Sequence, residues 1–336
     1  MSNPVLVETL RGSAVDLRHR GAIAVSDARG RLVWSTGDVE RPVYPRSAAK
    51  LFQALPLVES GAADHYGLSD RQLALACSSH SGEDGHVATA RAMLETVGLG
   101  EADLACGAHW PIFGQEQLIE FAGRGKTPTQ LHNNCSGKHA GFLCAACHQD
   151  IDLVGYVDAA HEIQSQVKAA QEAMTGFRLW GEVGAVDGCS IPTHAFPLRA
   201  LALGFARVAT GEGLESGRAA ATRRLMSACI AHPWFTAGTN RFCTRIIEAG
   251  EGAIYAKTGA DGVYVAALPT IGLGVALKCD DGSTAASELM LAAVLLRLLG
   301  GDDDNLRARL EPLVHRVITN WNGIEVGAMR SVALQG

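Results

Sequence analysis

The sequence predicts a mixed α/β protein of the α+β kind, in which N-terminal and C-terminal strands form one antiparallel sheet around a large inserted helical region. Three observations favour this class. Apolar and polar residues alternate at residues 21–38, and strand-like segments return after residue 250. Between them, apolar residues recur at helical spacing. Strands from the two ends of a chain can pair in one sheet when helices fill the middle.

The length and composition allow a large core. The chain has 336 residues, of which 47% are hydrophobic and 19% charged. A chain of this size forms one big domain or two closely packed ones. We expect a single compact unit over residues 1–336, with a sheet portion at about 20–45 and 250–336 and a mainly helical portion at 46–249.

The N-terminal strands are predicted by residues 21–38, which read GAIAVSD, ARG and RLVWSTGD. Alternating residues on both sides of a turn that contains Gly30 are typical of a β-hairpin. Residues 47–60 then have helical spacing and precede Gly61, a natural helix C-cap. Further helical patterns follow at 69–79, 84–100, 139–149, 160–174, 197–210 and 216–232.

The C-terminal strands are predicted by two segments. Residues 252–269, GAIYAKTGADGVYVAALP, are rich in Val, Tyr and Ile and are broken by the turn sequence GADG. Residues 270–282, TIGLGVALKCDDG, give a further strand. Residues 286–299, ASELMLAAVLLRLL, predict a largely buried helix.

Charge and hydropathy exclude several classes of partner. The net charge is −6 and no basic stripe is present, so nucleic acids and anionic membranes are not expected to bind. The first 20 residues lack the pattern of a signal peptide, and no apolar run reaches 18 residues. We expect a cytoplasmic protein without a membrane anchor.

The nine cysteines do not suggest a disulfide framework, because their number is odd and they are spread thinly along a long chain. Most are expected to be small buried residues, with two or three available for a metal or a reactive thiol. The LCAACH segment at 143–148 matches a haem-attachment pattern. It lies in an apolar helical pattern, and we interpret it as a buried helix face.

The first candidate for chemistry is Ser47 with Lys50, in RSAAK at 46–50. A serine at a helix N-terminus lies at the positive end of the helix dipole, and a lysine one turn later shares its face. When a second cation is close and the lysine is partly desolvated, it can lose its proton near neutral pH and act as a base. The alternative for this spacing is a capped helix with a solvated lysine.

A second motif, Lys257-Thr258-Gly259, lies on a predicted late strand. An early Ser-x-x-Lys and a late Lys-Thr-Gly are two of the three signatures of penicillin-recognising serine enzymes. The element order, with helices inserted into a sheet domain, also resembles that of serine β-lactamases and penicillin-binding proteins. The third signature, Ser-x-Asn, is absent, which counts against a β-lactamase.

The segment ACSSHSGEDGH at 76–86 offers a second serine. Ser78, Ser79 and Ser81 can each cap a helix. The alternative interpretation is that one of them faces Lys257.

A metal site is the third candidate. LHNNCSGKHAGFL at 131–143 is a polar turn that leads into a helix, and AVDGCSIPTHAFPL at 185–198 is a loop bounded by Gly and Pro. Each contributes one cysteine. Spacing alone suggests a shared metal site with Cys135, Cys189 and His139 as ligands.

Taken together, RSAAKLFQALPLVESGAADHYGLSD, SSHSGEDGH, LHNNCSGKHAGFL, DGCSIPTHAFPL and AKTGADGVY resemble the rhizobial, thermolabile type (class 3) of L-asparaginase. The resemblance runs from about residue 20 to 330, and several of its motifs exceed ten residues. It implies a serine β-lactamase-like fold, a homodimer and the hydrolysis of L-asparagine to L-aspartate and ammonia.

The resemblance also implies site residues. The catalytic groups would be two Ser-Lys pairs, Ser47 with Lys50 and Ser79 with Lys257. Arg46, His80 and Asp187 are candidates for substrate binding, of which Arg46 and Asp187 would hold the α-carboxylate and α-amine. Arg46 could equally belong to a surface ion pair, and Asp187 to a loop cap.

The family binds zinc through two cysteines and a lysine, which implies Cys135, Lys138 and Cys189 in this chain. Lysine replaces the histidine that spacing alone would choose, and this ligand rests on the resemblance. Three alternatives remain open: a glutaminase, a penicillin-binding or β-lactamase-type serine hydrolase, and a non-catalytic zinc-binding or redox-sensing protein.

Overall fold

The structure is a computed structural model that describes residues 2–112, 114–179, 184–301 and 303–332. The chain forms two compact units. Unit 1 comprises Met1–Ala48, Phe196–Thr210 and Arg245–Gly336, and unit 2 comprises Ala49–Ala195 and Gly211–Thr244. The sequence-based expectation of an antiparallel sheet from both chain ends, with helices inserted between them, is confirmed.

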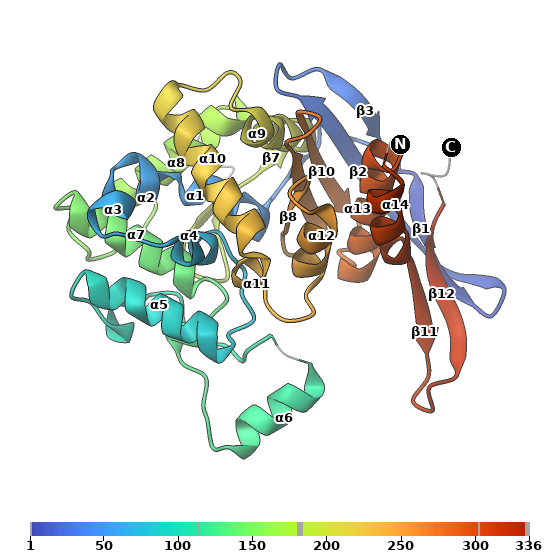
Figure 1. The fold of residues 1–336 in the computed structure, drawn as a ribbon, viewed down its shortest axis with the longest axis horizontal. Helices are drawn as coiled ribbons and strands as arrows, with labels where there is room; N and C mark the ends of the chain where they lie inside the picture. Colours follow the sequence, from blue (N-terminus) through green and yellow to red (C-terminus); the bar gives the residue numbers. More distant parts are fainter. Residues whose placement is uncertain (1, 113, 180–183, 302, 333–336) are drawn as a thin grey trace. The chain divides into compact units, whose positions relative to one another are not determined.

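Unit 1 is built on the antiparallel sheet, whose strands run in the order β11-β12-β1-β2-β10-β9-β8, with β3 paired to β2 (Figure 1). A strand from the N-terminal part of the chain, β2, therefore pairs at the centre of the sheet with a strand from the C-terminal part, β10. The strand bounds are β1 Val5–Arg11, β2 Ala14–Asp27, β3 Leu32–Thr36, β8 Tyr255–Thr258, β9 Val263–Leu268, β10 Leu273–Cys279, β11 His315–Thr319 and β12 Glu325–Ser331.

The central strands are buried on both faces. All six residues of β9 are buried, and so are the six residues of β2 from Gly21 to Ser26. The helices α9, Leu198–Thr210, and α13, Thr284–Leu299, both pack on this sheet. Gly274 in β10 allows α9 to approach closely, because a Cβ there would lie 2.1 Å from the Ala202 carbonyl oxygen.

Unit 1 also contains elements that the sequence interpretation did not include. The strand β1 and the β11–β12 hairpin extend the sheet beyond β2. Asn322-Gly323 in the β11–β12 turn is a strong hairpin signal that could have identified it. The remaining elements of unit 1 are β4 Pro42–Val43, β7 Phe196–Pro197, α14 Asp304–Leu310 and the 3₁₀ turn η4 Glu311–Leu313.

Unit 2 is mainly helical. The helix α7, Ser136–His148, is buried from Ser136 to Ala146 and packs against α2, α3, α4 and α5. A helix with buried residues all round belongs in the interior of a helical unit. The other elements are α1 Lys50–Gln53, α2 Leu55–Glu59, α3 Ala62–His65, α4 Asp70–Ala76, α5 Asp84–Thr96, η2 Glu101–Asp103, α6 Gln115–Gly123, η3 Gln130–His132, α8 Glu162–Thr175, β5 Gly184–Val186, β6 Pro192–His194, α10 Ser216–Ala231 and α11 Pro233–Thr236. The helix α12, Phe242–Gly250, includes the unit boundary at Thr244.

The helix expected at 47–60 is divided. Arg46–Ala49 form a 3₁₀ turn, η1, and α1 ends before Ala54. Pro56 then occupies the first turn of α2, where its missing N–H leaves no unpaired donor. Gly61 follows with φ 86°, so it supplies the left-handed residue after the last turn.

Within the described parts of the chain, no helix combines the length and apolar character that crossing a bilayer requires.

Candidate active site

Ser47 lies in unit 1, on a turn that is fixed to the Lys-Thr-Gly strand. The preceding residue, Arg46, has φ 51°, a strained value for a residue other than glycine. Gly259 packs against this turn so closely that a Cβ there would lie 2.3 Å from the Pro45 carbonyl oxygen and 3.3 Å from the Ala48 Cβ. The glycine of Lys-Thr-Gly therefore brings β8 against the two residues that flank Arg46 and Ser47.

Two further observations define this part of unit 1. The Arg46 guanidinium donates from Nη1 to Asp261 Oδ2 at 3.0 Å, in the turn that follows Gly259. Lys257 is completely buried, and its Nζ donates to the Thr258 carbonyl oxygen at 3.0 Å. The structure thus brings together Arg46, Ser47 and the Lys257 strand.

Lys50 is the first residue of α1 and belongs to unit 2. Its side chain is buried, with the residue 1% exposed. The Nζ atom lies 2.5 Å from the Ser78 carbonyl oxygen, 3.1 Å from the Asn134 carbonyl oxygen and 3.0 Å from the Ser79 hydroxyl. The end of α4 and the turn before α7 therefore converge on this amine.

The pKa of Lys50 is lowered from its ordinary value, chiefly because burial disfavours the ammonium form. The positive charge of Lys138 lowers this pKa further, whereas the Cys135 sulfur raises it. Lys138 is thus a second cation that acts on Lys50 within unit 2. The sequence interpretation assigned this role to Lys257, which belongs to unit 1, and that assignment stays a prediction.

The three serines of the segment after α4 have different contacts. The Ser78 hydroxyl donates to the Leu75 carbonyl oxygen at 2.7 Å, and the Ser81 hydroxyl donates to the Ala237 carbonyl oxygen at 3.1 Å. Both therefore hold the backbone. The Ser79 hydroxyl faces Lys50, as described above, so among these serines Ser79 has the contact that suits catalysis.

His80 is buried, and both of its ring nitrogens have partners in unit 2. Nδ1 accepts from the Gly82 N–H at 3.1 Å, and Nε2 lies 2.9 Å from the Ser136 hydroxyl oxygen. Since Ser136 already donates to the Leu131 carbonyl oxygen, Nε2–H is the donor in this contact. Burial places the pKa of His80 well below its usual value, so the ring is neutral.

The two loop cysteines and Lys138 lie together in unit 2. The Lys138 ammonium donates to the Cys189 sulfur at 3.0 Å. The hydrogen bond from the Cys189 thiol is the largest influence that lowers the pKa of Cys135, and it correspondingly raises the pKa of Cys189. Burial acts to lower the pKa of Lys138, but the two sulfurs outweigh it and raise that pKa. A Cys135 thiolate beside an ammonium is the resulting state.

Two thiols and one amine fit a zinc ion by their chemistry, because sulfur and nitrogen donors are its preferred ligands. Three protein ligands leave a fourth position of the tetrahedron open. Asn134 joins this group to Lys50. Its carbonyl oxygen accepts from Lys50, and its side-chain amide lies 3.0 Å from the Cys135 sulfur. Asn134 was missed by the sequence interpretation, although it lies in the same polar turn.

His139 has a different environment. Its Nδ1 lies 2.7 Å from the Tyr156 hydroxyl, which accepts a hydrogen bond from the Ala105 N–H. Tyr156 therefore holds the Nδ1 side of the ring, whichever of the two groups donates. Nε2 has no hydrogen-bond partner among the described residues. Lys138, in contrast, contacts the Cys189 sulfur directly. The choice between Lys138 and His139 as a zinc ligand stays a prediction.

Asp187 lies in the tight turn between β5 and β6. Its N–H donates to the Ile191 carbonyl oxygen at 2.8 Å, and its Oδ1 accepts from the Gly188 N–H at 2.8 Å. The carboxylate also acts electrostatically on Lys138. Asp187 is therefore a turn residue on the loop that carries Cys189, and its predicted substrate contact stays a prediction.

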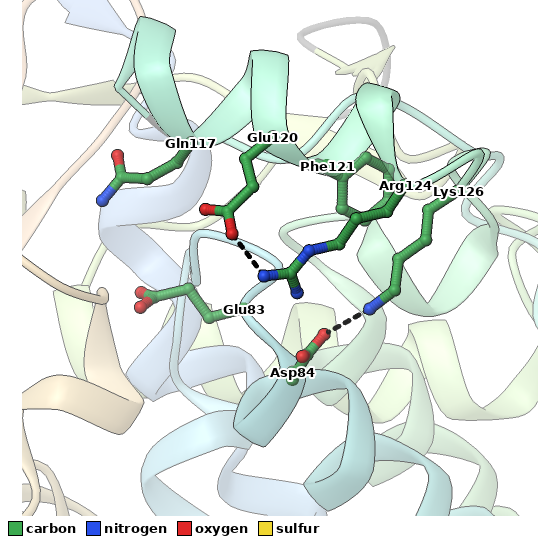
Figure 2. Close-up of a pocket in the computed structure, with 7 residues that line it drawn as sticks. All are labelled: Glu83, Asp84, Gln117, Glu120, Phe121, Arg124 and Lys126. Carbon is green, nitrogen blue, oxygen red and sulfur yellow. Dashed lines mark hydrogen bonds and ion pairs between the residues drawn. The ribbon is translucent and has the colours of Figure 1, made fainter.

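A separate pocket of about 240 Å³ lies beside α6 in unit 2 (Figure 2). Glu120 pairs with Arg124, and Lys126 pairs with Asp84, across its lining. None of the predicted site residues lines it; its lining consists of Glu83, Asp84, Gln117, Glu120, Phe121, Arg124 and Lys126.

Comparison with solved structures finds distant similarity. A structure of Mglu in its native form has 16% identity and a TM-score of 0.45, and the match covers 84% of this chain and 63% of that chain. A structure of Mglu in its glutamate form gives 18% identity, a TM-score of 0.45 and coverages of 85% and 62%. A β-lactamase from Mycobacterium bovis gives 13% identity, a TM-score of 0.40 and coverages of 82% and 93%. The chain thus spans less than two thirds of the length of these two Mglu structures.

A search among curated proteins finds no match. The family comparison is decisive: the profile of the family described as L-asparaginase II matches residues 7–331, nearly the whole chain. The match contains both Ser-Lys motifs and both loop cysteines, and it confirms the resemblance to an L-asparaginase family. The chain belongs to the L-asparaginase II family of amidohydrolases.

Proposed function

We propose that this protein is an L-asparaginase that hydrolyses L-asparagine to L-aspartate and ammonia through a serine acyl-enzyme. The observation that carries the proposal is the burial of Lys50, which lowers its pKa and lets it act as a base. A neutral lysine three residues after a serine in the sequence is a candidate to activate that serine.

The proposed reaction has two stages. Lys50 Nζ takes the proton of Ser47 Oγ, and Oγ bonds to the side-chain amide carbon of asparagine. The carbon–nitrogen bond of the side-chain amide then breaks. The nitrogen of that bond receives a proton, and ammonia leaves. In the second stage water attacks the ester, and aspartate leaves as Ser47 regains its proton. Ser79 and Lys257, paired by the family resemblance, transfer protons or hold the second water.

The contacts of Lys50 favour Ser79 as a second candidate nucleophile. A neutral amine has two N–H donors and one lone pair. The carbonyl oxygens of Ser78 and Asn134 can accept the two donors, so the lone pair is directed to the Ser79 hydroxyl at 3.0 Å. Mass spectrometry of the trapped acyl-enzyme distinguishes the two candidates. An aspartyl group on Ser47 supports the proposal, and an aspartyl group on Ser79 would identify Ser79 as the nucleophile.

We also propose that Cys135, Lys138 and Cys189 hold a zinc ion, as the family resemblance implies. Binding requires Lys138 to lose its proton and leaves the two sulfurs as thiolates. Zinc would supply a Lewis acid that polarises or orients a bound group. Arg46, His80 and Asp187 remain proposed substrate-binding residues.

The oligomeric state and the cellular location are also proposals. The resemblance implies a homodimer, and the sequence favours the cytoplasm. Light scattering on the purified protein would test the dimer, because the mass should be twice that of the 35.3 kDa chain.

The direct test of activity is ammonia release. Purified protein is incubated with L-asparagine, with L-glutamine and nitrocefin as competing substrates and Ser47→Ala as control. Ammonia from asparagine, lost in the control, supports the proposal. Faster release from glutamine would identify a glutaminase, and turnover of nitrocefin alone would identify a β-lactamase-type hydrolase.

A further inference from the structure

Three side chains with metal-binding atoms meet in unit 1, and none of them belongs to the candidate site described above. The ligand atoms of His19, Cys279 and Asp281 lie within 4.8 Å of one another. His19 Nδ1 is 2.7 Å from Asp281 Oδ2, and the Cys279 sulfur is 3.0 Å from Asp281 Oδ1. Among the described residues, this is the group of His, Cys, Asp and Glu side chains that can converge on one ion.

Strand register explains why these residues meet. In the β2–β10 pair, Cys279 is opposite Gly21. His19 lies two residues from Gly21 in β2, so it shares a face with Cys279. The chain turns directly after Cys279, and the Gly282 N–H donates to the Cys279 carbonyl oxygen at 3.2 Å, which brings Asp281 back to both side chains. Gly21 permits a close approach of the two strands, because a Cβ there would lie 2.5 Å from a backbone carbonyl oxygen of β10.

Neighbouring groups orient the three ligands. The His19 Nε2 atom is 3.0 Å from the Thr9 hydroxyl, in the adjacent strand β1. With the ring proton on Nε2, where it donates to Thr9, Nδ1 can exchange its contact with the Asp281 carboxylate for a cation, the usual arrangement for a metal-bound histidine. Asp281 Oδ1 accepts from the Ser283 N–H at 2.9 Å, just before α13. Ligands and supporting groups therefore come from β1, β2, β10 and the turn after it.

The cluster also has access to solvent and suitable chemistry. Cys279 and His19 are both buried, whereas the Asp281 side chain is 47% exposed and provides an entry path. A cation-to-ligand distance of about 2.0–2.3 Å requires ligand atoms about 3.3–3.8 Å apart, so the present contacts need to open by less than about 1.2 Å. One sulfur, one imidazole nitrogen and one carboxylate oxygen form a donor set that suits zinc or cobalt.

We propose that His19, Cys279 and Asp281 form a second divalent-metal site, of the zinc class, with water in the fourth position. Binding releases to solvent the proton that the Cys279 thiol shares with Asp281. The proton that His19 Nδ1 shares with Asp281 also leaves, and Nε2 takes up one proton, so the ring stays neutral and binds the cation through Nδ1. Lys278, the nearest lysine along the chain, points to the opposite strand face, where its Nζ donates to the Asp261 carbonyl oxygen at 2.8 Å and to that of Cys279.

The test uses Co²⁺ titrated into the full-length, metal-stripped protein. Thiolate-to-cobalt absorption and equilibrium dialysis report the site and its stoichiometry. The Cys135→Ser/Cys189→Ser variant removes the site proposed above and should still bind one cobalt per chain with a thiolate band. Adding Cys279→Ser should abolish that band, and adding Asp281→Asn should weaken cobalt binding at least tenfold.

Asp280→Asn is the matched control, because this neighbouring carboxylate bonds to Asn3 and Arg41 instead. It should leave cobalt binding unchanged. The proposal is overturned if the thiolate band is lost in Asp280→Asn or survives Cys279→Ser. It is also overturned if the Cys135→Ser/Cys189→Ser protein has native circular dichroism but binds no cobalt. If the Cys135→Ser/Cys189→Ser variant does not fold, the wild type is compared with Asp281→Asn. The wild type should bind two equivalents of cobalt per chain and Asp281→Asn should bind one. An unchanged stoichiometry overturns the site. If cobalt binding depends on Cys279 but not on Cys135, only the zinc site proposed at Cys135, Lys138 and Cys189 is refuted.

Discussion

At the residue scale, the catalytic proposal depends on the protonation of Lys50. An exposed lysine has a pKa near 10.4 and is a poor base at neutral pH. Here burial, and next the charge of Lys138, lower the pKa of Lys50. The same Lys138 lies beside the sulfur of Cys189, so the proposed base and the proposed metal ligands are electrostatically connected.

This connection predicts the pH dependence of turnover. Because the neutral amine is the active form, kcat/KM should rise with pH through the pKa of Lys50, at a pH below 10.4. In Lys138→Met one cation is gone, so the rising limb should move to higher pH. Lys257→Met is the comparison, since the sequence analysis expected Lys257 to be the second cation. pH–rate profiles of metal-stripped proteins check this, and an unmoved limb in Lys138→Met would show that Lys138 does not tune the base.

Residue roles were only partly accessible from the sequence. Spacing identified Ser47, Lys50, Cys135 and Cys189 as candidates, because their local patterns are unusual. It favoured His139 as the third metal ligand, whereas the family resemblance implied Lys138. The surroundings that distinguish these two residues, Tyr156 beside His139 and Cys189 beside Lys138, come from other segments of the chain. Similarly, the contact of Ser79 with Lys50 depends on packing between helices.

At the element scale, glycines bring the proposed site segments together. Gly137, in the Cys-Ser-Gly-Lys motif, lies where α7 meets the end of α4. A Cβ at this position would be 2.5 Å from the Leu75 carbonyl oxygen and 2.6 Å from the Leu75 Cγ. The close approach places the turn before α7 beside the serine segment that follows α4, and both contact Lys50.

Gly137→Ala should therefore lower the free energy of unfolding by about 1–3 kcal/mol, because backbone must move to admit the methyl group. Gly217→Ala is the matched control: Gly217 is also helical, and a Cβ there meets nothing within 4 Å. It should be neutral or stabilising by up to about 1 kcal/mol. Urea unfolding of both variants measures the difference. Equal effects in the two helices would mean that the α4–α7 contact does not require glycine.

Elements with strong local periodicity were predictable. The β2–β3 hairpin, the strands β8 to β10 and the helices α4, α5, α7, α8, α9, α10 and α13 occur where the sequence analysis expected them. The helix at 47–60 was predicted as continuous and is divided, because Pro56 starts a new helix after Ala54. The strand β1 and the β11–β12 hairpin were not predicted, since their stability depends on pairing with each other across the sheet.

At the scale of the whole molecule, zinc binding should stabilise the fold. A ligand that binds the folded chain at one hundred times its Kd adds about 2.7 kcal/mol to the unfolding free energy. Wild type should gain this from the first zinc site, and Cys135→Ala or Cys189→Ala should lose that gain. Lys138→Ala should lose it as well, whereas His139→Ala should keep it. Thermal unfolding with and without zinc measures the gain; if His139→Ala alone abolishes it, the histidine is the ligand.

The general architecture followed from the order of strand and helix patterns, which is set by the whole chain. The division into two units and the burial of Lys50 and Lys257 did not, because a lysine in the sequence gives no sign of whether it is buried. The family match shows an amidohydrolase, and the serine–lysine mechanism stays a prediction.

The central claim is that Ser47 and Lys50 act as one catalytic group, and a double-mutant cycle tests it most directly. Ammonia release from L-asparagine is measured for wild type, Ser47→Ala, Lys50→Ala and the double variant. Each single change should lower kcat by about 10³-fold or more, and the double variant should be little worse than either, since residues that act together are not additive. Clearly additive losses, or near-normal turnover in Ser47→Ala, would contradict the account.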